Sequence, residues 1–109
     1  GDVKDRDVII VDDEVDTGGS IAQAVDVCKK NGARDVYLAF LHAILSRDGA
    51  KRLASLPIKQ IITTDSAPIY PEKMKYLEGR ITVLSVAGLL GEVIKRAHEG
   101  RSVGEMFNE

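Results

Sequence analysis

An acidic pair followed by a glycine turn is the part of this sequence best suited to chemistry. Asp12 and Asp13 come directly after an apolar run, residues 8–11. The residues that follow with acid, hydroxyl and glycine character are Asp16, Thr17, Gly18, Gly19 and Ser20. Because glycine has no β-carbon, the backbone can turn sharply there, and a helix that begins at the turn directs unpaired N–H groups and the positive end of its dipole at one point. The pattern therefore predicts a phosphate-binding turn.

The spacing of these residues distinguishes the turn from two other kinds of phosphate-binding loop. It has neither the G-x-G-x-x-G of dinucleotide sites nor the Gly-Lys-Ser/Thr of a Walker A loop. The carboxylates of Asp12 and Asp13 can accept hydrogen bonds from vicinal hydroxyls, and a divalent cation can lie between them and further oxygens. A ligand with a phosphate at one end and a diol at the other is a ribose 5-phosphate. The structural alternative is an ordinary turn in which Asp16 or Thr17 caps the helix.

Strands and helices alternate along the chain in an order that would position this turn. Residues 8–11 are β-branched throughout, as in a strand buried on both faces of a parallel sheet. We expect strands over residues 8–12, 36–42, 59–65 and 80–86, and helices over residues 20–31, 47–56, 72–76 and 87–98, with Ser46 as the N-cap of the second helix. The alternation predicts an α/β fold, a parallel Rossmann-like sheet with flanking helices, in which ligands bind beyond the carboxyl ends of the strands.

Size and composition limit the classes of protein that this chain can represent. Its 109 residues allow a single domain, residues 1–109, and 44% hydrophobic with 29% charged residues is an ordinary balance for a globular domain. A net charge of −2 gives no broad basic surface for nucleic acid, and we expect no membrane partner. The single cysteine, Cys28, fits a core position and a reducing cytoplasm.

The segment from residue 8 to residue 20 resembles the phosphoribosyl-pyrophosphate motif of the type I phosphoribosyltransferase fold. Residues 1–6, the pair Leu41-His42 and the tail 99–107 are similar to the C-terminal part of the ribose-phosphate pyrophosphokinases, so the likeness covers the length of the chain. The resemblance implies the part of a cytoplasmic, oligomeric, Mg²⁺-using transferase that binds ribose 5-phosphate and phosphoribosyl pyrophosphate (PRPP). Enzymes of this family transfer pyrophosphate from ATP to ribose 5-phosphate, which gives PRPP and AMP.

The resemblance also implies roles for the residues of the motif. Residues 16–20 would hold the 5-phosphate through backbone N–H groups and hydroxyls. Asp12 and Asp13 would hold the ribose hydroxyls and Mg²⁺, directly or through ligand or water. The resemblance assigns no catalytic residue, because the catalytic basic residues of the family and most of its ATP contacts have no counterpart in this chain.

Other positions have weaker assignments. Glu14 departs from the family pattern, which is often apolar at this position, and it adds negative charge beside the turn. We expect His42, at the end of the second strand, to be a structural hydrogen-bonding residue. In the tail, Ser102, Val103 and Phe107 resemble residues that line an allosteric phosphate or ADP site between subunits in regulated members of the family; ordinary packing of the tail is the alternative.

The family enzymes are much longer than this chain. We therefore expect a C-terminal fragment of a longer enzyme, without useful turnover of its own. With four strands, the first strand should form an exposed apolar edge, which favours homo-oligomers or pairing with further sequence.

Alternative functions remain open on the same fold. One is a catalytically inactive regulatory or associated module, and another is an engineered fragment. A third is a phosphoribosyltransferase that acts on a purine or pyrimidine base, although the two ends of the chain speak against it and we find no segment for base recognition.

Overall fold

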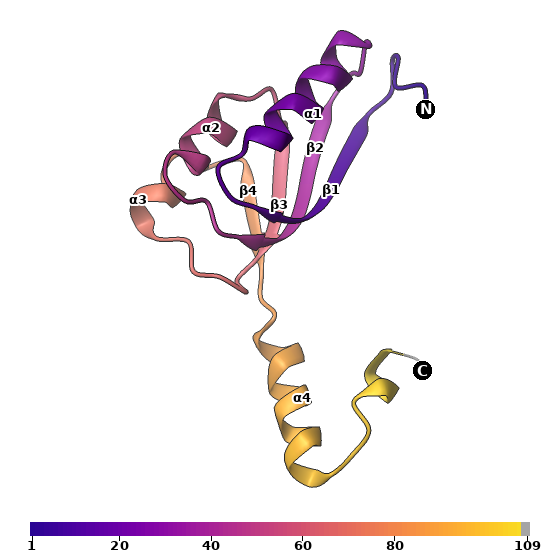
Figure 1. The fold of residues 1–109 in the computed structure, drawn as a ribbon, viewed down its shortest axis with the longest axis vertical. Helices are drawn as coiled ribbons and strands as arrows, with labels where there is room; N and C mark the ends of the chain where they lie inside the picture. The colour runs from indigo at the N-terminus through magenta and orange to yellow at the C-terminus, as the bar shows by residue number, and fades with distance from the viewer. Residues whose placement is uncertain (108–109) are drawn as a thin grey trace.

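The chain folds around a four-stranded parallel sheet in the computed structural model, which describes residues 1–107 (Figure 1). The strands are β1 Val8–Val15, β2 Val36–Ala43, β3 Gln60–Thr64 and β4 Ile81–Leu84, and they lie in the order β1-β2-β3-β4. The helices are α1 Gly19–Lys30, α2 Gly49–Ser55, α3 Pro71–Met74 and α4 Ala87–Glu99, and a 3₁₀ helix, η1, covers Gly104–Phe107. Each strand pairs in parallel with the next, which confirms the predicted α/β fold.

β1 extends farther than the sequence pattern indicates. We expected the strand to end near residue 12, but it pairs with β2 as far as Val15, which lies opposite Ala43. Within this extension Glu14 lies opposite His42. The strand continues through polar residues because β2 presents backbone partners along the same length. The acidic pair is therefore part of the strand itself, and its backbone geometry is fixed by the sheet.

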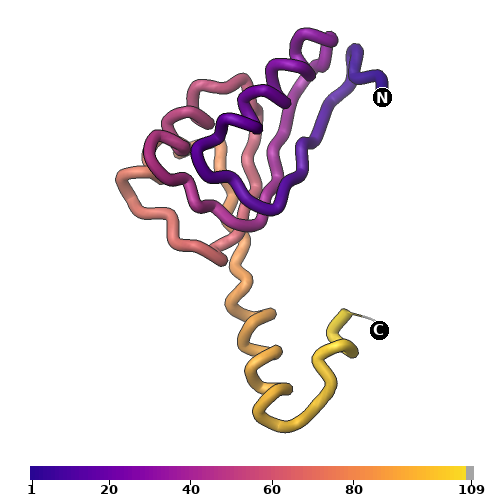
Figure 2. Tube along the Cα trace, viewed as in Figure 1, coloured from indigo at the N-terminus to yellow at the C-terminus, as the bar shows by residue number. Residues whose placement is uncertain are grey.

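Hydrophobic side chains between the sheet and the helices form the core. Alternate residues of β2, Val36, Leu38 and Phe40, are buried on the face of the sheet that the helices cover. From the helices, Val25 of α1 and Leu53 of α2 are buried against this face. Figure 2 shows the chain returning along the same side of the sheet after β1 and again after β2. Right-handed crossovers between strands that follow one another in order place the connecting helices on one side.

The opposite face of the sheet is uncovered by residues 1–107. The exposed apolar side chains on this face are Ile9, Val11, Leu41, Ile62 and Leu84. Val11 is 76% exposed, so the prediction that β1 is buried on both faces was wrong. The apolar sequence reflects a strand suited to two covered faces, while the described helices cover only one. β1 is also at the edge of the sheet, as the four expected strands predicted.

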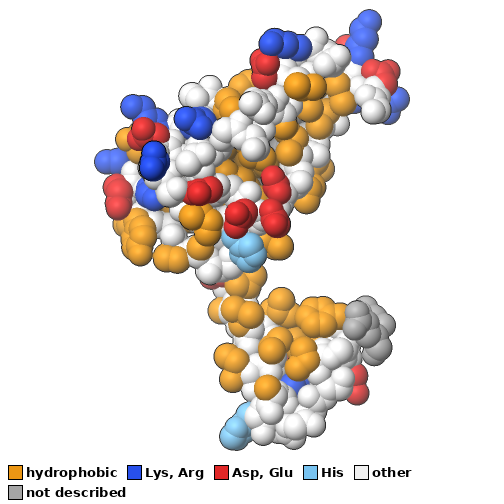
Figure 3. Space-filling model, in the orientation of Figure 1, with side chains coloured by type: hydrophobic (Ala, Val, Ile, Leu, Met, Phe, Trp, Pro, Cys, Tyr) orange, Lys and Arg blue, Asp and Glu red, His pale blue; other side chains and the backbone are white. Residues whose placement is uncertain are grey.

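α4 projects away from the sheet (Figure 1). None of its residues is buried, and Leu89, Leu90 and Ile94 are exposed. Figure 3 shows hydrophobic side chains gathered on this part of the molecule. After α4 the chain turns back beside the helix (Figure 1), and Nη1 of Arg96 donates to the carbonyl oxygen of Ser102 at 2.8 Å. No helix among the described residues is long and apolar enough to cross a membrane.

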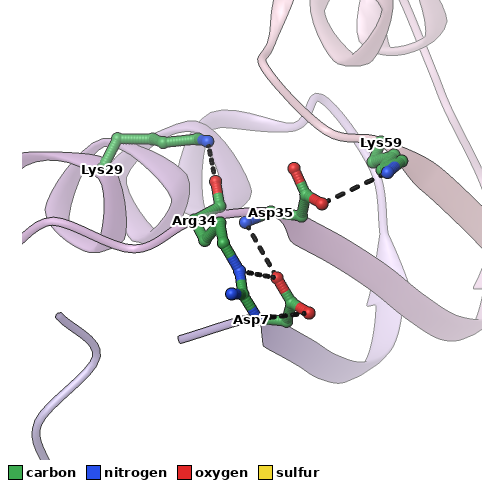
Figure 4. Close-up of polar contacts among 5 residues, drawn as sticks. All are labelled: Asp7, Lys29, Arg34, Asp35 and Lys59. Carbon is green, nitrogen blue, oxygen red and sulfur yellow. Dashed lines mark hydrogen bonds and ion pairs between the residues drawn. The ribbon is translucent and has the colours of Figure 1, made fainter. Parts of the chain in front are cut away.

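A group of charged side chains joins the starts of three neighbouring strands (Figure 4). The guanidinium of Arg34, before β2, donates to both carboxylate oxygens of Asp7, before β1, at 3.1 and 3.2 Å. The N–H group of Asp35 donates to the same carboxylate at 3.2 Å, and Nζ of Lys59, before β3, lies 3.2 Å from Oδ2 of Asp35. The pKa of Asp7 is lowered, first by the Arg34 hydrogen bonds and then by the Asp35 N–H group. This network fixes the amino ends of the strands relative to one another.

Replacing Asp7 with Asn should weaken the fold near neutral pH and matter less in acid. The pKa of Asp7 lies below its ordinary 3.8 in the folded chain. The ionised carboxylate therefore stabilises the fold fully above pH 3.8, and this stabilisation is lost as the pH falls through the folded-state pKa. We expect the urea midpoint of the Asp7→Asn variant to lie below that of the wild type at neutral pH, with a difference that shrinks below the ordinary pKa.

Asp5→Asn is the matched control for this measurement. The carboxylate of Asp5 makes no ion pair within residues 1–107, so the midpoint of this variant should follow the wild type at every pH. A difference for Asp7→Asn that stays constant from neutral to acidic pH would contradict a contribution from the ionised carboxylate.

Candidate functional site

One cavity gathers the residues that the sequence predicts to bind a sugar phosphate. It has a volume of about 290 Å³ and is lined by the continuous segment 12–21, which runs from the end of β1 into the first turn of α1. The predicted residues in its lining are Asp12, Asp13, Asp16, Thr17, Gly18, Gly19 and Ser20. Figure 3 shows acidic side chains clustered at this end of the sheet. The cavity has the location that ligands take in open α/β sheets, and the binding role of each residue stays a prediction.

α1 begins without a side-chain cap. Its N-cap is Gly18, in the left-handed conformation with φ 83° and ψ 6°, and no side chain bonds to the free N–H groups of the first turn. The helix ladder begins when the N–H group of Ala22 donates to the Gly18 carbonyl at 2.9 Å. The alternative in which Asp16 or Thr17 caps the helix was therefore wrong. Unpaired N–H groups at the positive end of a helix dipole favour an anionic group.

Asp16 ties this turn to the loop between β2 and α2. Its Oδ1 accepts hydrogen bonds from the N–H group of Ser46 at 3.2 Å and from the Ser46 hydroxyl. The neighbouring carbonyl of Val15 accepts the N–H groups of Ile44 at 3.1 Å and Leu45 at 3.0 Å. We expected Ser46 to cap the next helix, which was wrong, because α2 begins at residue 49 and the Ser46 side chain turns to Asp16 instead. Asp16 thus holds the turn in place.

Two residues of α2, Gly49 and Arg52, lie against the turn, and no sequence pattern predicted either contact. A β-carbon on Gly49 would lie 2.3 Å from the carbonyl oxygen of Asp16, so only glycine allows this approach. A β-carbon on Gly18 would lie 3.5 Å from Cδ of Arg52, whose side chain extends along the turn. No local pattern marks either residue, because both contacts join segments that are distant in the sequence.

The acids at the end of β1 interact with one another and with the backbone. Oδ1 of Asp12 accepts the N–H group of Asp13 at 2.8 Å, and Oδ1 of Asp13 accepts the N–H group of Glu14 at 2.8 Å. The pKa of Asp13 is lowered, first by a hydrogen bond with the Asp12 side chain, then by the Glu14 N–H group, and further by the charge of His42. Asp13 is therefore ionised at neutral pH and can accept hydrogen bonds or bind a cation. Glu14 also lines the cavity, so its charge adds to that of the pair.

His42 makes a structural hydrogen bond outside the cavity. Its Nδ1 lies 2.7 Å from Oγ of Ser66, which in turn donates to the carbonyl oxygen of Leu41 at 3.1 Å. The contact joins the carboxyl ends of β2 and β3, in agreement with the structural role expected for His42.

The carboxylates of Asp12 and Asp13 suit Mg²⁺ only together with a ligand. Among residues 1–107, no group of three or more His, Cys, Asp or Glu side chains could enclose a metal ion. Mg²⁺ often keeps several waters and binds one or two carboxylates together with substrate phosphates. Asp12 and Asp13 offer such a pair, so the donors present fit an ion shared with a phosphorylated ligand.

The tail residues with an expected allosteric role lie apart from this cavity. Ser102, Val103 and Phe107 follow α4, and none of them lines the cavity. The carbonyl of Ser102 is bonded to Arg96, and Phe107 is 52% exposed. Their allosteric role stays a prediction.

The parallel sheet, with its connecting helices and a glycine turn at the carboxyl end of β1, defines an α/β domain. A family model described as "Phosphoribosyl synthetase-associated domain" matches residues 1–108, and the chain belongs to this family. The resemblance to ribose-phosphate pyrophosphokinases that the sequence suggested is thereby confirmed.

Individual relatives agree with this assignment. The chain is 42% identical over 108 residues to "Ribose-phosphate pyrophosphokinase" of Haemophilus influenzae, covering 99% of this chain and 34% of the relative. It is 43% identical over 107 residues to the protein of the same name from Nostoc, covering 98% of this chain and 32% of the relative. The crystal structure of phosphoribosylpyrophosphate synthetase from Mycobacterium smegmatis matches with a TM-score of 0.85 and 40% identity, over 92% of this chain and 33% of that one. The chain thus spans about a third of the length of these relatives.

Replacing Gly49 with Ala should destabilise the fold, because the added methyl group has no room beside the Asp16 carbonyl. We expect a loss of about 1–3 kcal/mol in the free energy of unfolding, as at other overpacked positions. Urea denaturation followed by circular dichroism measures this loss.

Gly91→Ala, in α4, is the matched control. A β-carbon on Gly91 would meet nothing within 4 Å, and alanine favours a helix by about 1 kcal/mol relative to glycine. This variant should be as stable as the wild type or more so. Equal losses in both variants would show that the contact with Asp16 is not the cause.

Proposed function

We propose that this chain is the ribose 5-phosphate and PRPP-binding part of a ribose-phosphate pyrophosphokinase, which transfers pyrophosphate from ATP to ribose 5-phosphate and yields PRPP and AMP. The observation that carries the proposal is one cavity of about 290 Å³ whose lining includes both the carboxylate pair Asp12 and Asp13 and the uncapped N-terminus of α1. Carboxylates and free N–H groups suit the two ends of a ribose 5-phosphate. Family membership and the identity to pyrophosphokinases support it.

The phosphate end of the ligand would lie at the glycine turn. The N–H groups of Gly19 and Ser20 precede the helix ladder, and no side chain caps them. The hydroxyls of Thr17 and Ser20 add further donors in the lining of the same cavity. Hydrogen bonds to an ionised phosphate are shorter and stronger than those between neutral groups, so a few well-placed donors give both affinity and orientation.

The sugar end of the ligand would lie beside the carboxylates of Asp12 and Asp13. Asp12 and Asp13 accept hydrogen bonds from the ribose hydroxyls, and together they offer oxygens to a Mg²⁺ ion that also binds the ligand. Such an ion neutralises charge on the phosphate groups.

We assign no catalytic residue within this chain. Attack by the 1-hydroxyl of ribose on the β-phosphorus of ATP depends chiefly on positioning and on stabilisation of charge. This chain provides positioning for the sugar phosphate, and the remaining two thirds of a longer enzyme would provide the ATP contacts and the catalytic cations. Asp16 is not proposed as a general base, because positioning and stabilisation of charge do most of the work in this reaction.

The partners of the domain follow from its uncovered surface. The bare sheet face around Val11 and Leu41 and the exposed apolar side chains of α4 suit contact with the rest of such an enzyme or with further copies in a homo-oligomer. Ser102, Val103 and Phe107 would contribute to an allosteric phosphate or ADP site at such an interface.

A second function is an associated module that binds sugar phosphates without catalysis. The description of the matching family model, a synthetase-associated domain, favours it. Adding the other two thirds of a relative as a separate chain distinguishes the two functions. Restored formation of PRPP supports the enzyme, whereas stable assembly without turnover supports the module.

Titration calorimetry with ribose 5-phosphate, with and without Mg²⁺, tests the proposed site. The wild type should show saturable binding, and Thr17→Ala should weaken it about tenfold or more, because a hydrogen bond to a charged group contributes about 1.5–3 kcal/mol. Asp12→Asn should reduce the gain in affinity that Mg²⁺ gives.

Thr82→Ala is the matched control, since Thr82 is exposed on β4 and does not line the cavity. Its affinity should equal that of the wild type. Equal affinities for the wild type and Thr17→Ala would place the phosphate elsewhere, and a folded wild type that binds no ribose 5-phosphate would refute a site formed by this chain.

A further inference from the structure

The candidate cavity has an excess of negative charge. Four of its lining residues, Asp12, Asp13, Glu14 and Asp16, are acids, and neither lysine nor arginine is among the residues that line it. A phosphate monoester carries about 1.5 to 2 negative charges at neutral pH. Donors at the glycine turn must therefore bind an anion against the field of nearby carboxylates.

Arg52 brings a positive charge to the outside of this turn. A β-carbon on Gly19 would lie 3.5 Å from its Nη1, and a β-carbon on Gly18 would lie 3.5 Å from its Cδ and 3.7 Å from its Cγ. The aliphatic stem of Arg52 therefore lies along Gly18, and its guanidinium lies next to Gly19. Gly19 is the first residue of α1, so the guanidinium lies near the amino end of this helix.

The guanidinium of Arg52 is available to a ligand. The side chain is exposed, and it forms no ion pair within residues 1–107. Arg34 binds Asp7, Arg96 binds Glu92, and Arg80 donates to the carbonyls of 54, 56 and 58. Arg6 and Arg47 also form no ion pair within residues 1–107, but neither is among the nearest atoms given for Gly18 or Gly19.

The backbone of α2 holds Arg52 in register with the turn. Gly49, one helical turn earlier, lies against the Asp16 carbonyl so closely that no side chain fits between them. Asp16 is itself bonded to Ser46 in the loop that leads into α2. The guanidinium is thus carried by an element that is fastened to the turn at two points.

We propose that Arg52 is a phosphate-positioning residue of the sugar-phosphate site, whose guanidinium draws the ligand phosphate to the Gly18–Gly19 turn and offsets the charge of the surrounding carboxylates. This inference rests on the proposed function. The role requires a positive charge near the turn, because such a charge attracts an anion through space.

The test compares Arg52→Met, which keeps an apolar stem and removes the charge, with Arg52→Lys, which keeps the charge. Binding of ribose 5-phosphate is measured by calorimetry at low and high salt, and the urea midpoint of each variant is measured alongside. We expect Arg52→Met to bind about tenfold more weakly at low salt with a midpoint close to the wild type, and Arg52→Lys to regain most of the affinity. The salt dependence of binding should be flatter in Arg52→Met than in the wild type.

Lys51→Met is the control, because it removes the same charge from the preceding exposed position of α2. Its affinity should stay within twofold of the wild type. Wild-type affinity and salt dependence in Arg52→Met would overturn the role of Arg52 and leave the proposed function intact. If both Arg52→Met and Arg52→Lys bind ribose 5-phosphate equally weakly and have lowered urea midpoints, the role of Arg52 is in packing and the proposal is overturned. A folded wild type without binding would overturn both proposals.

Discussion

The hydrogen bonds between Asp16 and Ser46 hold together the two segments on which the candidate site depends. One segment is the turn from β1 into α1, and the other is the loop from β2 into α2. Asp16 places a carboxylate in a turn that is proposed to bind an anion. The repulsion between the two is smaller when hydrogen-bond donors engage this carboxylate. The N–H group and the hydroxyl of Ser46 both donate to Oδ1 of Asp16, and these hydrogen bonds stabilise the carboxylate and fix the turn. The close contact at Gly49 follows from the same approach.

A sheet with helices on one face explains both the site and the uncovered surface. Strands in sequential order with right-handed crossovers place α1 and α2 on the same side. The turn before α1 and the loop before α2 then meet at the carboxyl ends of β1 and β2. The same topology leaves the other face bare, with Val11 76% exposed. An apolar face of this kind is typical of a domain that contacts further protein.

The fold and the motif could be predicted from the sequence because both depend on local patterns. β-branched runs, apolar residues at helical spacing and the glycine turn each lie within a short segment, and the structure has all four strands in the predicted order. Errors occurred where distant contacts overrode local preference. β1 continues to Val15 because β2 pairs with it. Ser46 does not cap α2, because the helix begins at residue 49 and the Ser46 hydroxyl donates to Asp16.

The sequence alone determined the α/β class, the presence of a glycine turn at residues 16–20 and the family to which the chain belongs. The turn and the acids before it are recognised by glycines, hydroxyls and carboxylates at fixed spacing, and that spacing can be read from the linear sequence. Only the tertiary structure decided that Gly49 and Arg52 lie against the turn, and that one face of the sheet is bare. These features depend on how the crossover helices approach one another, and no short segment encodes that geometry.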